Sequence, residues 1–267
     1  MTDPVDLVSG AFTKGRPAFM PYFTLGYPDY ECSLQIVQAC AAAGADLMEL
    51  GIPFSDPLAD GPTIQHSTQV ALANGMTVAR CLTAVAELRA RGVAIPLMLM
   101  AYYNPILAHG ETRIAREAAA AGANGFIIPD LPPEEASTLE EHCQRGGLAL
   151  AYLLAPTSTE ARIKLVAQKA SGFVYLVSLT GVTGARSELP SALSDFVARA
   201  RRHVRHPLAV GFGISTLEQA QQVGGLADGV IVGSKLISVA GEANDPVKAC
   251  GAFARQMVAA LKDTDPH

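Results

Sequence analysis

Short apolar runs alternate along this chain with longer segments whose apolar residues recur every three or four positions. Short runs are typical of buried strands, and the longer period is typical of amphipathic helices. The pattern predicts eight strands, at residues 18–25, 46–50, 96–102, 125–129, 148–154, 173–178, 207–212 and 229–233. It predicts helices at residues 3–13, 33–43, 78–91, 112–121, 134–145, 160–170, 192–203, 216–223 and 246–262.

The alternation of predicted strands and helices indicates a repeated βα plan. Eight units of about 33 residues each match an α/β fold, a single (β/α)8 TIM barrel with an extra N-terminal helix. Small residues lead from a helix into a strand at 43–46, 121–125 and 226–229, which supports the repeat. A doubly wound dinucleotide-binding sheet is disfavoured, because residues 24–28 read TLGYP where that fold needs GxGxxG. No linker divides the chain, so we expect residues 1–267 to form one barrel domain.

Composition favours a fold with a large interior. Apolar residues make up 49% of the chain and charged residues 17%, below the roughly 25% that is usual. The net charge of −5 and the dispersal of most basic residues argue against nucleic-acid binding. One basic cluster closes a predicted helix, where cations complement the helix dipole. It consists of Arg199, Arg201, Arg202 and Arg205.

The cysteines and the hydropathy of the chain indicate its compartment. The five cysteines form no CxxC pair and leave one residue over, which fits reduced thiols better than disulfides or a zinc site. The N-terminus has no signal-peptide pattern, and the longest wholly apolar runs, about eight residues, are much shorter than a membrane span. We therefore expect a soluble cytoplasmic protein with no membrane partner.

The second predicted strand and the loop after it carry candidate catalytic residues. Active sites of barrel enzymes lie at the carboxyl ends of the strands, and Glu49 lies near that end between large apolar residues. Burial raises the pKa of a carboxyl toward neutrality, where it can both donate and accept a proton. The loop presents Asp56 and Asp60, and its three prolines restrict the backbone. A structural salt bridge for Glu49, and turn contacts for the two aspartates, are the alternatives.

Glycines gather after the last three predicted strands. Gly184 follows the sixth strand, Gly213 the seventh, and Gly233 and Ser234 the eighth. Barrels of this class bind phosphate at such loops, because backbone N–H groups and a helix dipole favour an anion there. The cluster therefore predicts a phosphate site, although each glycine alone is equally typical of a turn.

The lysines and histidines limit the chemistry. The lysines lie outside the predicted strands, which disfavours a Schiff base, and the histidines fall in helices, loops or the tail, which disfavours metal-assisted cleavage. We expect no metal and no cofactor in this chain. Carboxylate acid–base chemistry on a phosphate-bearing small molecule remains, with an apolar end of the site formed by Tyr22, Met100, Ile127 and Phe212.

Residues 49–65 read ELGIPFSDPLADGPTIQ. This run closely resembles the signature of the tryptophan synthase α subunit family, and the resemblance extends over nearly the whole chain. It implies cleavage of indole-3-glycerol phosphate to indole and glyceraldehyde 3-phosphate, a retro-aldol reaction. Glu49 would then shuttle the proton. Asp60 would accept a hydrogen bond from the indole N–H and stabilise the cationic ring.

The resemblance assigns further residues to the site. Tyr175 resembles the family's hydroxyl near the active site, and Thr183 resembles the residue of a loop, 179–187, that closes over the ligand. Tyr22 departs from the pattern, since the family often places Phe in the indole pocket. A hydroxyl there changes contacts without changing the chemistry.

The resemblance also implies a partner. Family α subunits pair with a PLP-dependent β subunit in an αββα heterotetramer, and indole passes directly to the β active site. The expected docking face is the surface around residues 53–61, 102–108 and 129–135, where Pro53 and Asp56 fit better than in a catalytic role. PLP is expected on the β subunit and not in this chain.

Three other functions fit parts of the pattern. A stand-alone lyase would use the same residues and release free indole. A regulatory subunit that senses a phosphate ligand would need the phosphate site but no catalysis by Glu49. A phosphosugar isomerase on a similar barrel would fit the glycine cluster but not the loop after the second strand.

Overall fold

Eight parallel strands form a closed barrel at the centre of the computed structural model, which describes residues 4–177, 191–211 and 213–264. Each strand pairs with its neighbours in the sequence, and β1 pairs with β8 to close the ring. The strands are β1 Ala18–Thr24, β2 Met48–Gly51, β3 Leu97–Met100, β4 Gly125–Ile127, β5 Ala149–Leu154, β6 Val174–Val177, β7 Leu208–Gly211 and β8 Gly229–Val232.

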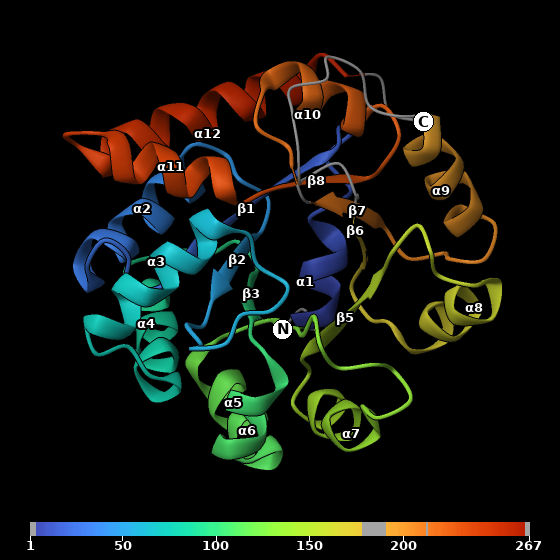
Figure 1. The fold of residues 1–267 in the computed structure, drawn as a ribbon, viewed down its shortest axis with the longest axis horizontal. Helices are drawn as coiled ribbons and strands as arrows, with labels where there is room; N and C mark the ends of the chain where they lie inside the picture. Colours follow the sequence, from blue (N-terminus) through green and yellow to red (C-terminus); the bar gives the residue numbers. More distant parts are fainter. Residues whose placement is uncertain (1–3, 178–190, 212, 265–267) are drawn as a thin grey trace.

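The helices are α1 Pro4–Gly10, α2 Tyr30–Ala42, α3 Pro62–Ala73, α4 Val78–Ala90, α5 Tyr103–His109, α6 Glu111–Ala121, α7 Ser137–Arg145, α8 Glu160–Lys169, α9 Ser191–Arg201, α10 Leu217–Gly224, α11 Ser234–Glu242 and α12 Pro246–Lys262. In Figure 1, α1 lies at the centre of the view, and the other helices surround the barrel on its outer side. The predicted (β/α)8 barrel with an extra N-terminal helix is confirmed.

Two apolar layers hold the barrel together. The outer layer lies between the strands and the helices, and the inner layer fills the barrel. In β2, Met48 and Leu50 belong to the outer layer. Since successive side chains of a strand point to opposite faces, Glu49 between them points into the barrel. Its strand position therefore sets a carboxyl among apolar inner side chains.

Helix α1 closes the amino-terminal end of the barrel. Its Val8 is fully buried and packs against Gly172, just before β6. Phe12, which follows the helix, packs against Phe173 with tilted ring planes and a ring-centroid distance of 5.7 Å. Both contacts lie where strands begin, so the carboxyl ends of the strands are left to form the site.

The sequence pattern missed three helices and misplaced some boundaries. The pattern predicts no helix over α3, α5 or α11, because it assigns one helix to each strand. The predicted helix at 134–145 begins only at Ser137, since the Glu135 N–H donates to the Pro132 carbonyl in a turn. Most predicted strands are longer than the observed ones, because apolar residues continue beyond the last ladder hydrogen bond.

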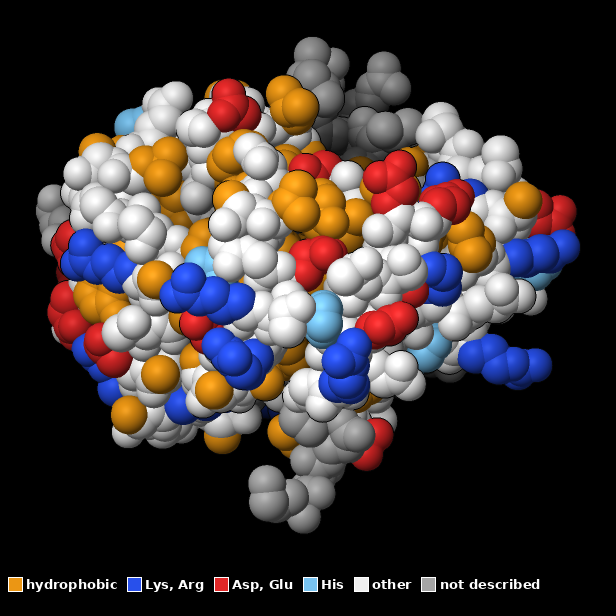
Figure 2. All heavy atoms as spheres, turned by 90° about the horizontal axis from the view of Figure 1, so that it is seen from below, with side chains coloured by type: hydrophobic (Ala, Val, Ile, Leu, Met, Phe, Trp, Pro, Cys, Tyr) orange, Lys and Arg blue, Asp and Glu red, His pale blue; other side chains and the backbone are white. Residues whose placement is uncertain are grey.

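Several charged side chains of the described surface form ion pairs. Arg113 with Glu117 and Arg145 with Glu141 are ion pairs one helical turn apart. Figure 2 shows basic and acidic side chains interspersed on the face that it presents. In the basic cluster, Arg201 lies in the last turn of α9, as predicted, and pairs with Asp228 at 2.6 Å.

All five cysteines are free thiols, four of them buried, which confirms the expectation from their spacing. Within the described residues, no helix combines the length and the apolar character that a membrane crossing needs.

Candidate active site

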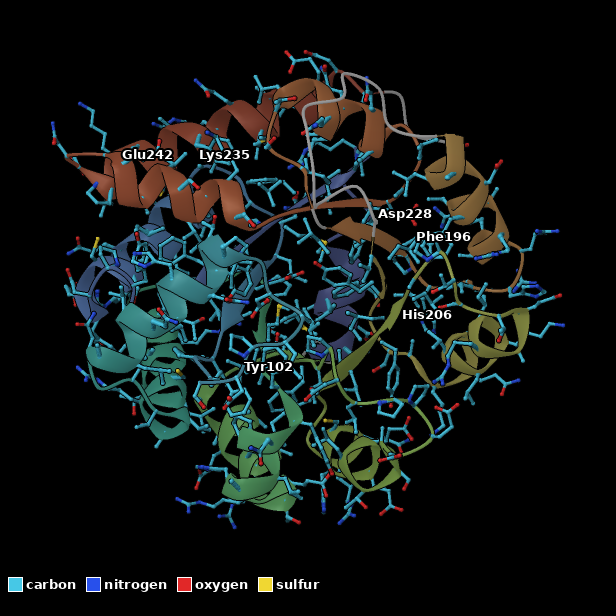
Figure 3. All side chains as sticks on the ribbon, viewed as in Figure 1. Tyr102, Phe196, His206, Asp228, Lys235 and Glu242 are labelled. Atoms are coloured by element: carbon cyan, nitrogen blue, oxygen red, sulfur yellow. The ribbon has the colours of Figure 1, made fainter. Side chains whose placement is uncertain are left out.

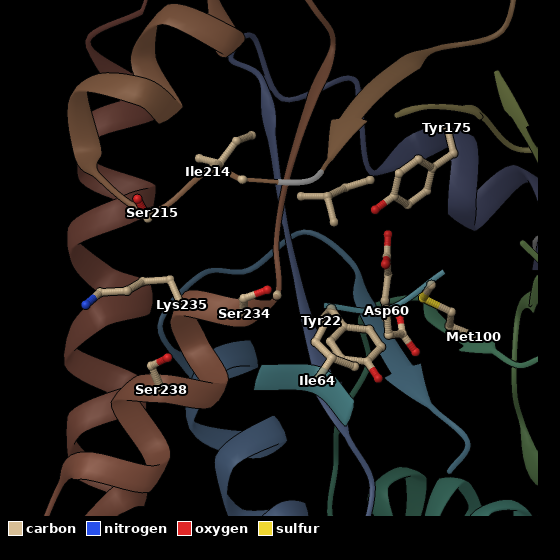
Figure 4. A pocket seen from close by; sticks show the side chains of 14 residues that line it. Tyr22, Asp60, Ile64, Met100, Tyr175, Ile214, Ser215, Ser234, Lys235 and Ser238 are labelled. Atoms are coloured by element: carbon tan, nitrogen blue, oxygen red, sulfur yellow. The ribbon is translucent and has the colours of Figure 1, made fainter. Parts of the chain in front are cut away.

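A cavity of about 210 Å³ opens at the carboxyl ends of the strands (Figure 4). It brings together most of the described residues that the sequence predicted for the site. These are Tyr22, Glu49, Asp60, Met100, Tyr175, Gly213, Gly233 and Ser234.

Some predicted residues are not among those that line this cavity. Ile127 is fully buried in the inner apolar layer and does not line it. Thr183, Gly184 and Phe212, together with loop 179–187, lie outside the described residues.

Sequence reasoning also missed residues that line the cavity. Ile64 lies inside the 49–65 run, and Lys235 directly follows Ser234. For both residues, closeness in the sequence to a predicted site residue was the signal that could have found them. The residues not predicted are Ile64, Ile214, Ser215, Ile231, Lys235 and Ser238.

Glu49 is the deepest polar group of the site. Its Cα pairs in register with that of Tyr22 on β1, and its side chain has no exposed surface. Neither carboxyl oxygen has a hydrogen-bond partner in the described part of the chain, which contradicts the salt-bridge alternative there. Burial raises the pKa of Glu49 to about 8. The carboxyl is therefore protonated at neutral pH and can give up and regain a proton in one cycle.

Asp60 is held by a tyrosine that the sequence analysis did not assign to the site. The Tyr102 hydroxyl donates a hydrogen bond to the Asp60 carboxylate, and its oxygen accepts the Ala59 N–H at 2.9 Å. Burial raises the pKa of Asp60 to about 6, and the bond from Tyr102 opposes this rise. Asp60 is therefore mainly ionised at neutral pH, while Glu49 is mainly protonated.

A chain of hydroxyl groups fixes the proton of Tyr22. Ser67 Oγ donates to the Ile64 carbonyl at 2.8 Å and lies 2.8 Å from Thr24 Oγ1, which lies 3.2 Å from Tyr22 Oη. A hydroxyl has one proton. Because Ser67 uses its proton on a carbonyl, Thr24 donates to Ser67 and Tyr22 donates to Thr24. The oxygen of Tyr22 is left as an acceptor.

Two glycines make room for the tyrosines of the site. A Cβ at Gly51 would collide with the Tyr22 hydroxyl, and a Cβ at Gly211 would collide with the Tyr175 hydroxyl. Both tyrosines are buried, and burial together with the nearby acidic groups raises their pKa values. Their hydroxyls therefore stay protonated. In Figure 4, Tyr175 and Asp60 converge on the same part of the cavity.

The opposite side of the cavity is suited to an anion. Gly233 precedes α11 without a side-chain cap, and the first hydrogen bond of that helix runs from the Ile237 N–H to the Gly233 carbonyl. The N–H groups of the first turn, beginning with Ser234, therefore have no acceptor within the helix. Gly213, at φ +80°, turns the neighbouring loop along the same rim. These features form the type of site that binds phosphate.

No group of three or more His, Cys, Asp or Glu side chains within the described ranges could hold a metal ion. The closed parallel barrel, with two acidic side chains and an anion-binding rim at its carboxyl ends, defines an enzyme of the (β/α)8-barrel class.

The family model of the tryptophan synthase alpha chain matches residues 9–264, and the chain belongs to that family, whose members are carbon–carbon lyases. The tryptophan synthase alpha chain of Dehalococcoides mccartyi is 50% identical over 250 residues, which cover 94% of this chain and 97% of the relative. Tryptophan synthase of Saccharomyces cerevisiae is 47% identical over 236 residues, 88% of this chain but only 33% of that longer protein.

A solved structure, tryptophan synthase subunit alpha from Legionella pneumophila, superposes with a TM-score of 0.91 at 36% sequence identity. The match covers 98% of this chain and all of that one. The family model and the curated relatives thus support the family, and the solved structure supports both fold and family.

Proposed function

We propose that this protein cleaves indole-3-glycerol phosphate to indole and glyceraldehyde 3-phosphate, the alpha reaction of tryptophan biosynthesis. The proposal is carried by one observation: a fully buried carboxyl without a partner in the described chain, Glu49, lines the same cavity as an ionised one, Asp60. As a biosynthetic enzyme, the protein is proposed to work in the cytoplasm.

The reaction needs one proton to move in and one to move out. Protonated Glu49 gives its proton to the indole ring carbon that carries the side chain. The bond from that carbon to the first glycerol carbon then breaks, and its electron pair returns to the ring. The hydroxyl on the glycerol carbon becomes the aldehyde and gives its proton to Glu49, which restores the starting state. A carboxyl with a pKa of about 8 suits both steps.

The other residues stabilise charge and hold the ligand. Asp60 accepts the indole N–H and faces the positive charge that ring protonation creates. Tyr175 presents its hydroxyl to the same space, and Tyr22 and Met100 contact the ring. Ile127, Phe212 and Thr183 stay predicted contacts for the ring or the closing loop. Gly213, Gly233 and Ser234, with Gly184 as a further predicted donor, bind the phosphate.

Replacing Glu49 by Gln tests the proposal. We expect indole formation by the purified chain to fall by roughly 10² to 10⁴-fold, because an amide cannot transfer the proton. Asp56→Asn is the matched control, since Asp56 is exposed in the next loop and does not line the cavity. Full activity of the Glu49→Gln variant would contradict the assignment and favour the phosphate-sensing alternative.

We also propose a PLP-dependent β subunit as the partner, in an αββα assembly, with PLP bound only by that subunit. In the expected docking face, Leu58 is 94% exposed and Leu107 is 56% exposed. Large apolar side chains at such exposure are typical of interfaces when they cluster. The yeast relative supports the pairing, because the matched part is a third of a longer tryptophan synthase.

Turnover with and without a β subunit separates this proposal from the stand-alone lyase. A paired enzyme should form indole faster in the complex, whereas a stand-alone lyase should reach the same rate alone. The measurement is indole formation from indole-3-glycerol phosphate at increasing β subunit concentration.

A further inference from the structure

The charges around the cavity are unequal at its two sides. At neutral pH Asp60 is mainly ionised and Glu49 is mainly protonated, and the chain as a whole carries a net charge of −5. A phosphate-bearing ligand is itself an anion, so the Asp60 carboxylate and the net charge oppose its approach. Among the described residues that line the cavity, Lys235 is the only one with a cationic side chain.

Lys235 is the second residue of α11, directly after Ser234 at the anion-binding rim. In Figure 4 its side chain points outward, away from Asp60 and from the middle of the cavity, and passes between Ser215 and Ser238. Glu242 lies at the other end of the same helix (Figure 3), about 10 Å further along the axis. The long side chain can sweep the rim, because it has four rotatable bonds and is only partly buried.

Lys235 also differs from several other lysines in having no carboxylate partner. Lys14 pairs with Asp46, Lys164 with Glu160 and Lys169 with Glu140. No ion pair joins Lys235 to an acidic side chain in the part of the chain that the structure describes. Its ammonium group is therefore available to an incoming anion.

We propose that Lys235 is a phosphate-binding residue that sets the orientation of the substrate. The proposal rests on the function proposed above and adds a cationic residue to its phosphate site. The cavity is then polarised, with acidic groups around the ring and a cation beside the free N–H groups of α11. An anionic end enters next to Lys235, and the neutral ring is left to face Glu49 and Asp60.

The size of the effect follows from the distance and the screening. An ammonium group and a phosphate at the rim are within about one Debye length, roughly 10 Å at 0.1 M salt. Their attraction across a wet rim is modest, so loss of Lys235 should weaken phosphate binding by about threefold to tenfold. The loss should shrink as salt rises. The chemical step should not change, because the phosphate is remote from the bond that breaks.

Lys235→Met and Lys248→Met form a matched pair for the test. Lys248 is exposed at the start of α12, has no ion pair with a described residue and does not line the cavity. Calorimetric titration of the full chain with inorganic phosphate and with glycerol 3-phosphate, at about 20 and about 200 mM salt, gives Kd and its salt dependence.

We expect Lys235→Met to raise both Kd values and the KM of the substrate at low salt, with kcat unchanged. Lys235→Arg should retain binding, and Lys248→Met should match the wild type. Lys235→Gln serves if the Met variant does not fold. Equal Kd, equal KM and an equal salt dependence in a folded Lys235 variant would overturn the proposal.

The two proposals fail in different ways. A wild-type chain that binds glycerol 3-phosphate through Lys235 but forms no indole would refute the proposed reaction and retain the binding role. A chain that forms indole with no contribution from Lys235 would retain the proposed reaction and refute the binding role of Lys235.

Discussion

Burial of the Glu49 carboxyl suits the proposed proton transfer but lowers the stability of the fold when the group is ionised. Its carboxyl oxygens have no partner in the described chain, and the side chains around it inside the barrel are mainly apolar. The neutral form suits this environment, whereas the charged form lacks the solvation that water gives in the unfolded chain. The burial that suits Glu49 to the proposed proton transfer therefore makes the fold less stable whenever the carboxyl is ionised.

Glu49→Gln should accordingly change the pH dependence of stability. The carboxyl titrates near 4.5 in the reference state and near 8 in the folded barrel. Below the lower value both proteins carry a neutral side chain. As pH rises through this interval, the unfolded wild type loses its proton first, so wild-type stability falls. Above the upper value the variant should be more stable by up to about 5 kcal/mol.

Urea unfolding of both proteins at about pH 5, 7 and 9 measures this difference. The gap in the free energy of unfolding should widen with pH. A gap that stays constant would show that Glu49 keeps an ordinary pKa in the folded state.

The same residue shows what the sequence could predict. The sequence pattern predicts that Glu49 lies near the end of a strand, between large apolar residues. This is predictable because the order of residues within one strand is local information. The contact of Tyr102 with Asp60 was not predictable in this way. It joins the loop after β2 to the end of β3, and only the closed barrel brings these two segments together.

At the scale of elements, the hydroxyl chain joins β1 to α3. Thr24→Val keeps the shape of the side chain but removes both of its hydrogen bonds, so the buried Tyr22 hydroxyl loses its acceptor. We expect a loss of about 1 to 3 kcal/mol. Adding Tyr22→Phe removes the unsatisfied hydroxyl and should recover part of that loss.

A double-mutant cycle by urea unfolding tests the hydroxyl chain. The sign of the coupling energy is the critical result. The loss of stability in the double variant should be smaller than the sum of the losses in the two single variants. Simple additivity would mean that Tyr22 does not depend on Thr24.

The missed helices have identifiable causes. α3 begins with Pro62 at its first position, a usual helix start, but the preceding Pro- and Gly-rich run obscured it. α5 has only seven residues and is separated from α6 by Gly110, at φ +93°. α11 follows β8 after a single glycine, which was interpreted as part of a phosphate loop. Helix periodicity is a weak signal in an element as short as α5.

At the scale of the whole molecule, the exposed leucines make the docking face testable. Leu58→Asp and Leu107→Asp should each weaken β subunit binding by about tenfold or more, because a charge would be buried at the interface. Leu7→Asp is the control, since Leu7 is 42% exposed on α1 at the other end of the barrel.

The β subunit concentration that gives half-maximal acceleration of indole formation measures the binding. The isolated variants should keep wild-type unfolding midpoints, since these side chains are exposed. An equal shift for Leu7→Asp would place the docking surface elsewhere.

The position of α1 at the amino-terminal end of the barrel has a consequence for how ligands enter and leave the site. With Val8 and Phe12 packed against the starts of the strands, the cavity opens at the opposite end. Reactants and products pass through this opening. Any protein that sits over it therefore controls where the aromatic product goes next, without touching the chemistry inside.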